Sequence, residues 1–338
     1  MISKLLDLKV IKGGSDKLFS KIKSLLDPKV LGIDFGDKLI KVVEIELSRK
    51  DTKLKKLALI ENDSMVINGM IKDFSRLKER LKSVLAEKGI RAKKVITAVS
   101  SERITKTIIE VPVMPYGDLE KVLPVEFEYY ATLPLEQISF QYEILSEKNG
   151  KYKVLVMGVK KSIIYDYLNL FEELNLNPLA IEAEFMALAR FIRRLSNDNQ
   201  QNCCIIDLGS NTTDVSIIHQ GKVIFNRTVE SGEDDFASTK DQLVTFKGLA
   251  TKVYRCLDYF EIKYRDYQIN KVLLAGAKNR CTGFIQELAN IIGVEISEIA
   301  WGSRLEIDLN HEDMSLYNDN RDIFTVSVGL ALRGDKDD

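Results

Sequence analysis

Two short segments of the chain each place an aspartate near the end of an apolar run, with a glycine two residues later. They are Leu31–Gly36 and Ile205–Ser210. Glycine in such a turn lets a phosphate oxygen approach the exposed backbone N–H groups without meeting a Cβ atom. Two facing turns of this kind predict a clamp for the phosphates of a nucleotide.

The aspartates of these turns, Asp34 and Asp207, are the candidate magnesium ligands. Mg²⁺ prefers octahedral oxygen coordination and keeps several waters, so two carboxylates acting through water suffice to hold it. A single Asp-x-Gly sequence carries almost no information. Its recurrence in matched contexts predicts a magnesium–nucleotide site.

Two further segments could complete this site. The apolar run Val272–Ala277 contains Gly276, which would let the backbone lie against an adenosine. The run Ile181–Arg190 predicts a helix on which Glu182 or Glu184 is the candidate for orienting a hydrolytic water. Ordinary carboxylates on a helix surface are at least as good an interpretation of these two glutamates.

Strand patterns surround both aspartates and would position them. Short apolar runs separated by turn residues predict strands in both halves of the chain, with amphipathic helices between them. The repetition predicts two related lobes that face each other. The expected strands are Val30–Phe35, Ile40–Leu47, Leu54–Ile60, Lys94–Val99, Cys203–Leu208, Thr213–His219, Lys222–Val229 and Lys271–Ala275.

A stretch between the two halves has the pattern of an inserted module with its own small core. It combines a helix face around Val122–Tyr130 with two strands joined by an Asn149-Gly150 hairpin signal, and a helix over Ile163–Leu174 follows. The expected division of the chain is a basic amphipathic N-terminal segment over 1–29, the first part of lobe 1 over 30–103, the inserted module over 104–178, a connecting helix over 179–199, lobe 2 over 200–324 and a C-terminal helix returning to lobe 1 over 325–338.

The composition narrows the class of protein. The 338 residues hold 49 Lys and Arg against 50 Asp and Glu, a net charge of −1, which gives no indication of nucleic-acid binding. No apolar run approaches the roughly 18 to 20 residues needed to cross a bilayer, so we expect a cytoplasmic protein. The lysine-rich N-terminal segment is interpreted as a short helix docked on the main domain or, alternatively, as a weak contact with acidic lipids.

The order of the motifs resembles the actin-like ATPase superfamily and, within it, the PilM family of type IV pilus assembly proteins. The likeness covers nearly everything from Val30 onward. It implies an α/β fold with two actin-like lobes, which are duplicated ribonuclease H-like units, and an inserted small α+β subdomain of the 1C type. The matching segments are DFGDKLIKVVEI and IIDLGSNTTDVSII for the two phosphate segments, EAEFMALAR and VSVGLALRG for the connecting and C-terminal helices, and LLAGA for the adenosine motif.

The resemblance also implies a cofactor and its ligands. We expect ATP or ADP with Mg²⁺, slow hydrolysis at most, and Glu182 as the catalytic candidate. The turn Asp37-Lys38 departs from the small polar residues that are usual at this place in the family, and it adds an anion near a phosphate. The candidate cofactor-binding residues are Asp34, Gly36, Asp37, Lys38, Lys41, Asp207, Gly209, Ser210, Asn211, Thr212, Gly276 and Ala277.

The function that the resemblance implies is a nucleotide-controlled scaffold of the pilus platform at the inner face of the cell membrane. Its partner would be the cytoplasmic N-terminal tail of a PilN-like membrane protein, with contacts to other platform and motor proteins and possible self-association. We expect the tail in a groove where Ile104–Val111 leaves lobe 1 and Leu119–Leu133 begins. The alternative is that these apolar residues pack the module's own core.

Two other functions on the same fold remain as alternatives. An FtsA-like cell-division protein would tether itself by a C-terminal amphipathic helix, whereas Arg333–Asp338 is short and acidic. A small-molecule kinase needs a positioned base beside a phosphate loop, and the sequence offers no convincing one. The chain also has no Gly-x-x-x-x-Gly-Lys-Ser/Thr motif, which disfavours a Walker-type ATPase.

Overall fold

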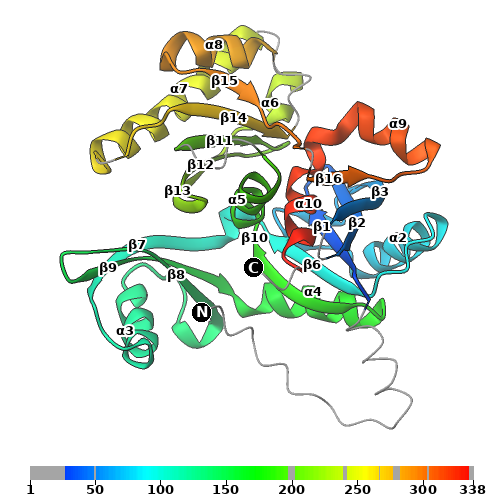
Figure 1. The fold of residues 1–338 in the computed structure, drawn as a ribbon, viewed down its shortest axis with the longest axis horizontal. Helices are drawn as coiled ribbons and strands as arrows, with labels where there is room; N and C mark the ends of the chain where they lie inside the picture. The colour runs from blue at the N-terminus through cyan, green and yellow to red at the C-terminus, as the bar shows by residue number, and fades with distance from the viewer. Residues whose placement is uncertain are drawn as a thin grey trace.

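The computed structural model describes residues 27–48, 51–196, 202–238, 242–265, 267–276, 282–302 and 304–334. They form two lobes that meet at two central helices, with a smaller module beside the first lobe (Figure 1). Most of the predicted N-terminal segment over 1–29, namely residues 1–26, lies outside the described residues, as does the candidate Ala277.

Lobe 1 is built on a mixed sheet. Its strands β1 and β2 form a hairpin, β3 extends it, and β6 and β10 continue the sheet parallel to β1 on the other side. A short strand from the second half of the chain, β16, closes the far edge beside β3. The strands are β1 (Lys29–Phe35), β2 (Leu39–Leu47), β3 (Thr52–Glu61), β6 (Lys94–Val99), β10 (Asn177–Ala183) and β16 (Leu305–Ile307), with a small hairpin of β4 (Val66–Ile67) and β5 (Met70–Ile71).

Lobe 2 repeats this plan in a sheet of five strands, with no equivalent of β16 among the described residues. The order β13-β12-β11-β14-β15 matches β3-β2-β1-β6-β10, because in both sheets a three-stranded antiparallel meander is followed by two parallel strands. The predicted duplication is therefore confirmed. The elements are β11 (Cys203–Leu208), β12 (Thr213–His219), β13 (Lys222–Val229), β14 (Lys271–Gly276), β15 (Ile296–Glu298), α6 (Glu233–Ser238), α7 (Gln242–Lys263) and α8 (Thr282–Ile292).

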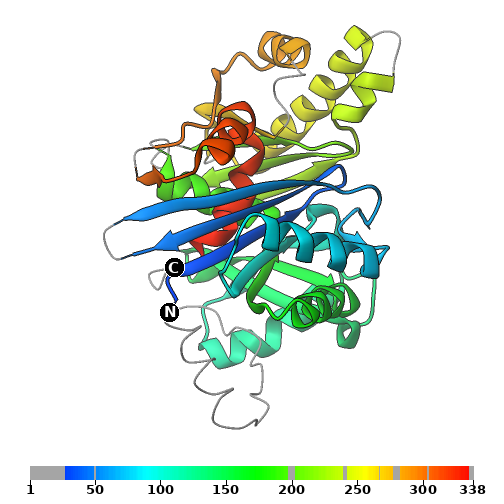
Figure 2. The same ribbon diagram turned by 90° about the vertical axis from the view of Figure 1, so that its right-hand side faces the viewer.

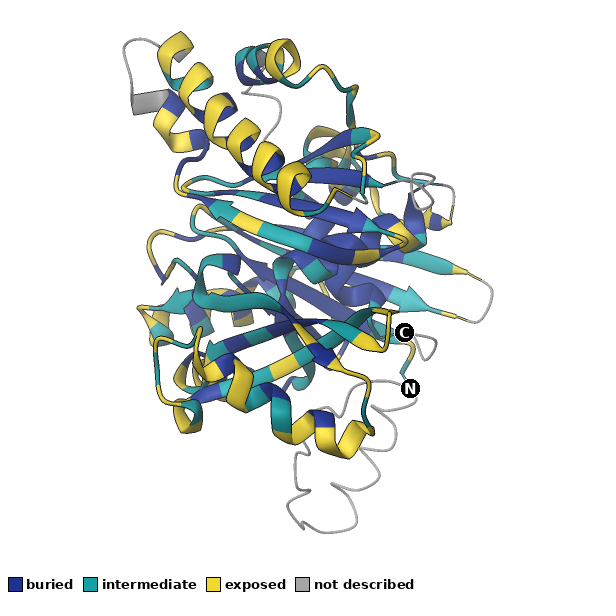
Figure 3. Cartoon of the chain, turned by 90° about the vertical axis from the view of Figure 1, so that its left-hand side faces the viewer, coloured by how far each residue is buried: buried dark blue, intermediate teal, exposed yellow. Residues whose placement is uncertain are grey.

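Two helices, α5 (Glu184–Leu195) and α10 (Thr325–Leu332), cross between the lobes. They approach closely, because a Cβ on Gly329 would lie 2.1 Å from the carbonyl oxygen of Ala187. Figure 2 shows α10 lying across the strands of lobe 1, and Figure 3 shows the buried band that runs through both sheets. The short α9 (His311–Asn320) and a 3-10 turn (Arg321–Phe324) lead into α10.

The inserted module is a three-stranded sheet, ordered β7-β9-β8, covered by one helix. Leu119, Leu123 and Phe127 of that helix are buried in the module's own core. These three residues therefore pack the module's own core, which was the alternative interpretation, and do not line a peptide groove. The elements are a 3-10 turn (Ser101–Arg103), β7 (Ile104–Pro112), α3 (Tyr116–Glu128), a second 3-10 turn (Leu135–Gln137), β8 (Ile138–Lys148) and β9 (Lys151–Lys160).

Two boundaries differ from those expected. The helix α4 (Lys161–Glu173) packs on lobe 1 through Tyr167 and Phe171, so the module with a core of its own ends near Lys160 instead of Pro178. The predicted helix over Ile181–Arg190 begins only at Glu184, because Ile181 to Ala183 pair with β6 as part of β10. The hairpin signal at Asn149-Gly150 is correct, since both residues have positive φ.

The remaining predicted elements lie within a few residues of the observed ones. Lobe 1 also contains α2 (Phe74–Glu87), whose first turn is capped by the Asp73 carboxylate accepting from the Arg76 N–H. Among the described helices, none is both long enough and apolar enough to span a membrane.

Candidate functional site

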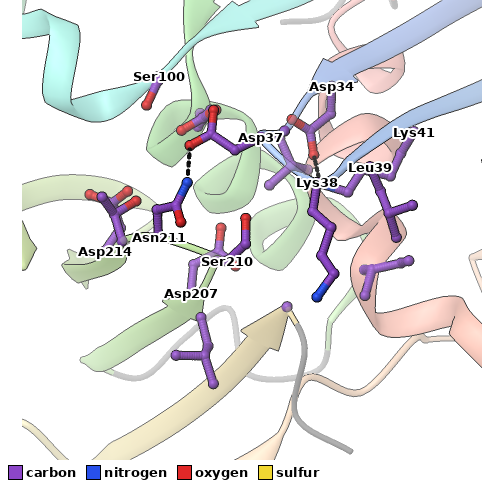
Figure 4. Close-up of a pocket in the computed structure, with 18 of the residues that line it drawn as sticks. Asp34, Asp37, Lys38, Leu39, Lys41, Ser100, Asp207, Ser210, Asn211 and Asp214 are labelled. Carbon is purple, nitrogen blue, oxygen red and sulfur yellow. Dashed lines mark hydrogen bonds and ion pairs between the residues drawn. The ribbon is translucent and has the colours of Figure 1, made fainter. Parts of the chain in front are cut away.

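A cavity of ≈ 130 Å³ lies between the lobes, at the turns that end the β1–β2 and β11–β12 hairpins (Figure 4). Every predicted cofactor-binding residue that the structure describes lines it. The cavity therefore unites residues from two halves of the chain. Its lining includes Asp34, Gly36, Asp37, Lys38, Lys41, Asp207, Gly209, Ser210, Asn211, Thr212 and Gly276.

The buried side chain of Asn62 anchors the lobe 1 turn. Asn62 donates from Nδ2 to the carbonyl oxygens of Gly36, Asp37 and Val66 at 2.9, 2.8 and 2.6 Å. Because these carbonyls accept from Asn62, the turn is fixed in shape before any ligand arrives.

The lobe 2 turn is held by backbone contacts. Gly209 donates its N–H to the Thr212 carbonyl at 2.9 Å, and Glu233 N–H donates to the Gly209 carbonyl at 2.9 Å. Gly276 has a φ of +82°, and a Cβ there would lie 2.3 Å from the Leu208 carbonyl oxygen. Only glycine allows β14 to pass so close to the turn.

Gly232 supports the lobe 2 turn, and the sequence alone did not indicate this. A Cβ there would lie 2.4 Å from the Ser210 carbonyl oxygen, so this glycine lets the start of α6 sit directly on the lobe 2 turn. The Glu230-Ser231-Gly232 sequence after β13 was the available signal.

In lobe 1 the cavity carboxylate has a partner. Lys41 Nζ lies 3.1 Å from Asp34 Oδ2, and the two residues are opposite each other in the hairpin register. Burial alone would lower the pKa of Lys41, but the charge and hydrogen bond of Asp34, followed by Asp207 and Glu184, raise it overall. Lys41 is therefore a firmly charged ammonium tied to Asp34.

In lobe 2 the pair at the equivalent hairpin positions consists of two acidic residues. Asp207 is opposite Asp214 in the register of β11 and β12. Burial, then Asp214 and Asp34, raise the pKa of Asp207 to about 7, against a smaller lowering by Lys41. Burial also raises the pKa of Asp214, which accepts hydrogen bonds from Thr228 and Asn226.

The structure brings Glu184 to the cavity and leaves Glu182 away from it. Glu182 lies in β10 and is held by Arg190, at 2.5 and 2.9 Å, and by Arg333, at 2.5 Å. It ties the two interlobe helices together, so the choice of Glu182 as the water-orienting residue has to be corrected. Sequence periodicity could not separate the two glutamates, because the boundary between β10 and α5 lies between them.

Glu184 has the environment expected of a group that handles protons. It begins α5, lines the cavity, and accepts a hydrogen bond from the Ser101 N–H at 3.3 Å. Burial, followed by the charges of Asp34, Asp214 and Asp207, raises its pKa well above the ordinary range of a glutamate. Such a shifted carboxyl group in a cavity is a candidate acid or base.

The donor set of this cavity fits a hydrated divalent cation. Asp34 is buried and Asp207, Asp214 and Glu184 are partly buried around one space. Loss of solvation is the main cause that raises the pKa of the last three, and neighbouring carboxylates raise it further at Asp207 and Glu184. No group of three or more ligating side chains in the described residues is arranged to hold a metal directly. This arrangement suits Mg²⁺, which keeps its waters and takes further oxygens from phosphates.

A second groove, of ≈ 510 Å³, lies where the module leaves lobe 1. One wall is the start of β7 with Ile104 and Lys106, and the other is β13 with Tyr259 of α7. Strand β13 is at the edge of the lobe 2 sheet. The Asn226 Oδ1 atom at this edge is buried and has no hydrogen-bond partner among the described residues.

The duplicated lobes, the helices between them and the cavity at the paired turns define the class: the protein has the actin-like ATPase fold. A solved PilM–PilN type IV pilus biogenesis complex contains a chain with a TM-score of 0.79 and 21% identity, over 90% of this chain and 98% of that one. The family model of the type IV pilus assembly protein PilM matches residues 32–240. The chain belongs to the PilM family of type IV pilus assembly proteins.

Two other solved structures are similar at a lower level. The ethanolamine utilization protein EutJ from Carboxydothermus hydrogenoformans has a TM-score of 0.48 and 13% identity, over 90% of this chain and 89% of that one. MreB 5 of Spiroplasma citri, bound to AMPPNP, has a TM-score of 0.47 and 11% identity, over 80% and 91%. Membership of the PilM family favours the pilus-assembly interpretation over the FtsA-like and kinase alternatives.

Proposed function

We propose that the interlobe cavity binds ATP or ADP together with Mg²⁺ and that the bound nucleotide sets how the lobes are held. The observation that carries this proposal is the pair of matched hairpin turns, each with a glycine and an aspartate, on opposite sides of one cavity. Glycine turns that expose backbone N–H groups favour phosphate oxygens.

Each part of the cavity has a distinct task in this proposal. The turns after Phe35 and Leu208 would bind the phosphates, and Gly276, which lines the same cavity, would lie beside the adenosine. Asp34 and Asp207 would hold Mg²⁺ through water, and the bound ion would supply charge neutralisation of the phosphates. The ion pair with Lys41 holds the Asp34 carboxylate at this place.

Hydrolysis, in this proposal, is slow. Glu184 is the carboxyl group positioned to accept a proton from an attacking water, but burial and the neighbouring carboxylates raise its pKa and so oppose the ionised form that a base needs. Glu184→Gln should remove the residual turnover. Sustained turnover near the typical enzyme scale of about 10 per second would contradict a switch-like role.

The binding proposal is tested by thermal unfolding with ATP and Mg²⁺. Ligand at about a hundredfold over its Kd stabilises the folded state by roughly 2.7 kcal/mol, so the wild-type Tm should rise. Asp207→Ala should weaken this response, while Asp118→Ala, which changes an exposed carboxylate of the module, should leave it intact. The absence of any shift at millimolar ATP would overturn nucleotide binding.

We further propose that the protein is a scaffold at the inner face of the membrane, tethered by the cytoplasmic tail of a PilN-like membrane protein. Family membership and the fold shared with a chain of a PilM–PilN complex support this partner. The protein would lie in the cytoplasm, and contacts with other platform and motor proteins or with a second copy would extend the same assembly.

The groove between β7 and β13 is the surface that suits an extended tail. An edge strand offers backbone hydrogen-bonding groups to an extended peptide. Tyr259 and Phe225 supply aromatic surface beside it. The groove includes Ile104, so it meets the expected location on one side, but its other wall is lobe 2 instead of α3.

Calorimetry with the N-terminal tail peptide of the PilN-like protein tests this surface. Tyr259→Ala should weaken binding about tenfold or more if the ring is a binding hot spot. Tyr165→Ala is the matched control, since Tyr165 is an exposed tyrosine on α4, away from the groove. Equal effects of the two variants would place the tail elsewhere, and no binding by the wild-type protein would remove the partner.

A further inference from the structure

The cavity between the lobes has a charge that opposes its proposed ligand. Six acidic and two basic residues are among the described residues that line it. A nucleotide polyphosphate is itself an anion, so the acidic lining repels it unless cations come within reach. The two lysines of the lining, Lys38 and Lys41, therefore decide how much of this repulsion the protein offsets by itself.

Lys41 is committed to the cavity wall. Its side chain is 17% exposed, its ammonium lies 3.1 Å from Asp34, and it also comes within 2.6 Å of a Cβ built on Gly36. Moving it onto a ligand would leave the buried Asp34 carboxylate without a partner, which is costly. Lys41 acts where it is.

Lys38 is in the opposite situation. Its side chain is 46% exposed, and its ammonium pairs with Asp234 Oδ1 at 3.0 Å, a carboxylate that is 47% exposed. An ion pair between two half-exposed side chains contributes little to stability, so the ammonium can leave Asp234 at small cost. Lys38 belongs to the turn that faces the proposed phosphates (Figure 4).

We propose that Lys38 is a direct ligand of the nucleotide polyphosphate and that Asp234 holds its ammonium until the nucleotide arrives. The proposal rests on the nucleotide binding argued above. The exchange is an ion-pair swap in which no covalent bond changes: the Lys38 ammonium leaves the Asp234 carboxylate and donates to a phosphate oxygen.

The two partners of this swap come from different lobes, and their anchors differ. Lys38 stands on the β1–β2 turn, whereas Asp234 is fixed at the start of α6 by its own N–H, which donates to the Ser210 carbonyl at 2.9 Å. Asp37, the neighbour of Lys38, is turned away from this swap, because its carboxylate accepts from Asn68 N–H at 2.6 Å and from Asn211 Nδ2 at 2.8 Å. In the unusual Asp37-Lys38 sequence, Asp37 thus bridges to the lobe 2 turn, and Lys38 is the proposed phosphate ligand.

Calorimetric titration with ADP and Mg²⁺, and separately with tripolyphosphate and Mg²⁺, tests the assignment. Lys38→Met should weaken both about tenfold, the size of one lost charge-assisted contact, and should lower the dependence of affinity on salt. Asp234→Asn should strengthen both about two- to fivefold, because the competing carboxylate is gone. Lys53→Met, which breaks the comparable surface pair with Glu306, is the matched control and should change neither.

The outcomes separate the two proposals. If the wild-type protein binds ADP and Lys38→Met binds it equally well, the assignment of Lys38 is wrong while nucleotide binding stands. If Asp234→Asn weakens binding, the carboxylate is a positioning group and the swap is wrong. If the wild-type protein binds neither probe, both proposals fall. Unfolding midpoints of the two variants within error of wild type show that the folded state is unchanged.

Discussion

The hairpin turns of the two lobes share a skeleton and differ in charge. In both, an aspartate precedes the glycine by two residues, and the residue opposite it across the hairpin follows seven positions later. That residue is Lys41 in lobe 1, where it pairs with Asp34, and Asp214 in lobe 2, where it repels Asp207. The two hairpins therefore share their geometry and differ in the sign of the charge at this one position.

This difference assigns the two lobes different tasks. The lobe 1 carboxylate is neutralised inside the protein, so it contributes a fixed, oriented ion pair to the cavity. The lobe 2 carboxylate has a pKa of about 7 and carries a charge that only a proton or an incoming cation can neutralise. We therefore expect lobe 1 to be pre-organised and lobe 2 to be the side that responds to a ligand.

The largest expected effect comes from breaking the lobe 1 pair. Lys41→Met leaves Asp34 buried without its partner, and removal of one member of a buried ion pair costs about 3 to 5 kcal/mol. The free energy of unfolding, measured by urea denaturation at pH 8, should fall by that amount.

The matched substitution in lobe 2 should not lower the free energy of unfolding. Asp214→Asn removes a like charge beside Asp207 while keeping a side-chain oxygen that can accept the hydrogen bonds of Thr228 and Asn226. At pH 8 it should leave stability unchanged or raise it. A loss in Asp214→Asn as large as that in Lys41→Met would show that the two hairpins are electrostatically alike after all.

The next effect is the pH dependence of stability that Asp207 produces. Its pKa in the folded state, about 7, is above that of an unfolded aspartate, so the folded state holds a proton that the unfolded state has lost. The stabilisation is present at low pH and is lost as the pH rises from about 4 to about 7, at up to about 1.4 kcal/mol per pH unit.

Asp207→Asn should remove this slope, because asparagine does not titrate. Between pH 5 and pH 7 the wild-type protein should lose about 2 to 3 kcal/mol more of its unfolding free energy than the variant does. Urea denaturation at pH 5, 6 and 7 measures the difference, with the exposed Asp118→Asn as the control that should follow wild type. Parallel pH profiles for wild type and Asp207→Asn would refute the shifted carboxyl group.

The same contrast shows what the sequence could predict. The strands, the two turns and their convergence on one cavity follow from apolar alternation and from the repeated Asp-x-Gly, because backbone pairing places equivalent residues in equivalent positions. The repeat also placed Lys41 and Asp214 at one offset. Their opposite electrostatic roles could have been inferred from that offset alone.

Other features were not accessible because they depend on contacts distant in sequence. The choice between Glu182 and Glu184 depends on where β10 stops pairing with β6 and on Arg333. The assignment of α4 to lobe 1 depends on Tyr167 and Phe171 packing beside Phe35. Periodicity shows that a helix has an apolar face but does not show which sheet covers it.

A smaller effect should appear in the pH dependence of ADP affinity, and its sign should depend on magnesium. Without Mg²⁺, lowering the pH from 8 to 6 protonates Asp207 and removes a charge that repels the phosphates, so ADP should bind more tightly. With Mg²⁺ the carboxylate is needed as a ligand, so the same change should weaken binding. Without Mg²⁺ the change should fall mainly above pH 7 and level off below it, whereas with Mg²⁺ it should approach tenfold per pH unit below pH 7, and calorimetry measures both. The same trend in both buffers would mean that Asp207 does not serve the metal.

The smallest expected effect concerns the bridge between the two turns. Asn211 donates to Asp37 at 2.8 Å in an exposed place, and Asp37 keeps its bond from Asn68 N–H when Asn211 is removed. Asn211→Ala should therefore cost less than about 1 kcal/mol of unfolding free energy. Asn62→Ala should cost clearly more, since it leaves three carbonyls without their donor. Because the Asn211 bridge crosses the mouth of the cavity, its loss should also speed the association of a fluorescent ADP analogue by about two- to fivefold in stopped-flow mixing. Equal destabilisation by Asn211→Ala and Asn62→Ala would show that the lobe 2 turn is anchored as rigidly as the lobe 1 turn. An unchanged association rate in Asn211→Ala would show that the lobes open without breaking the Asn211–Asp37 contact.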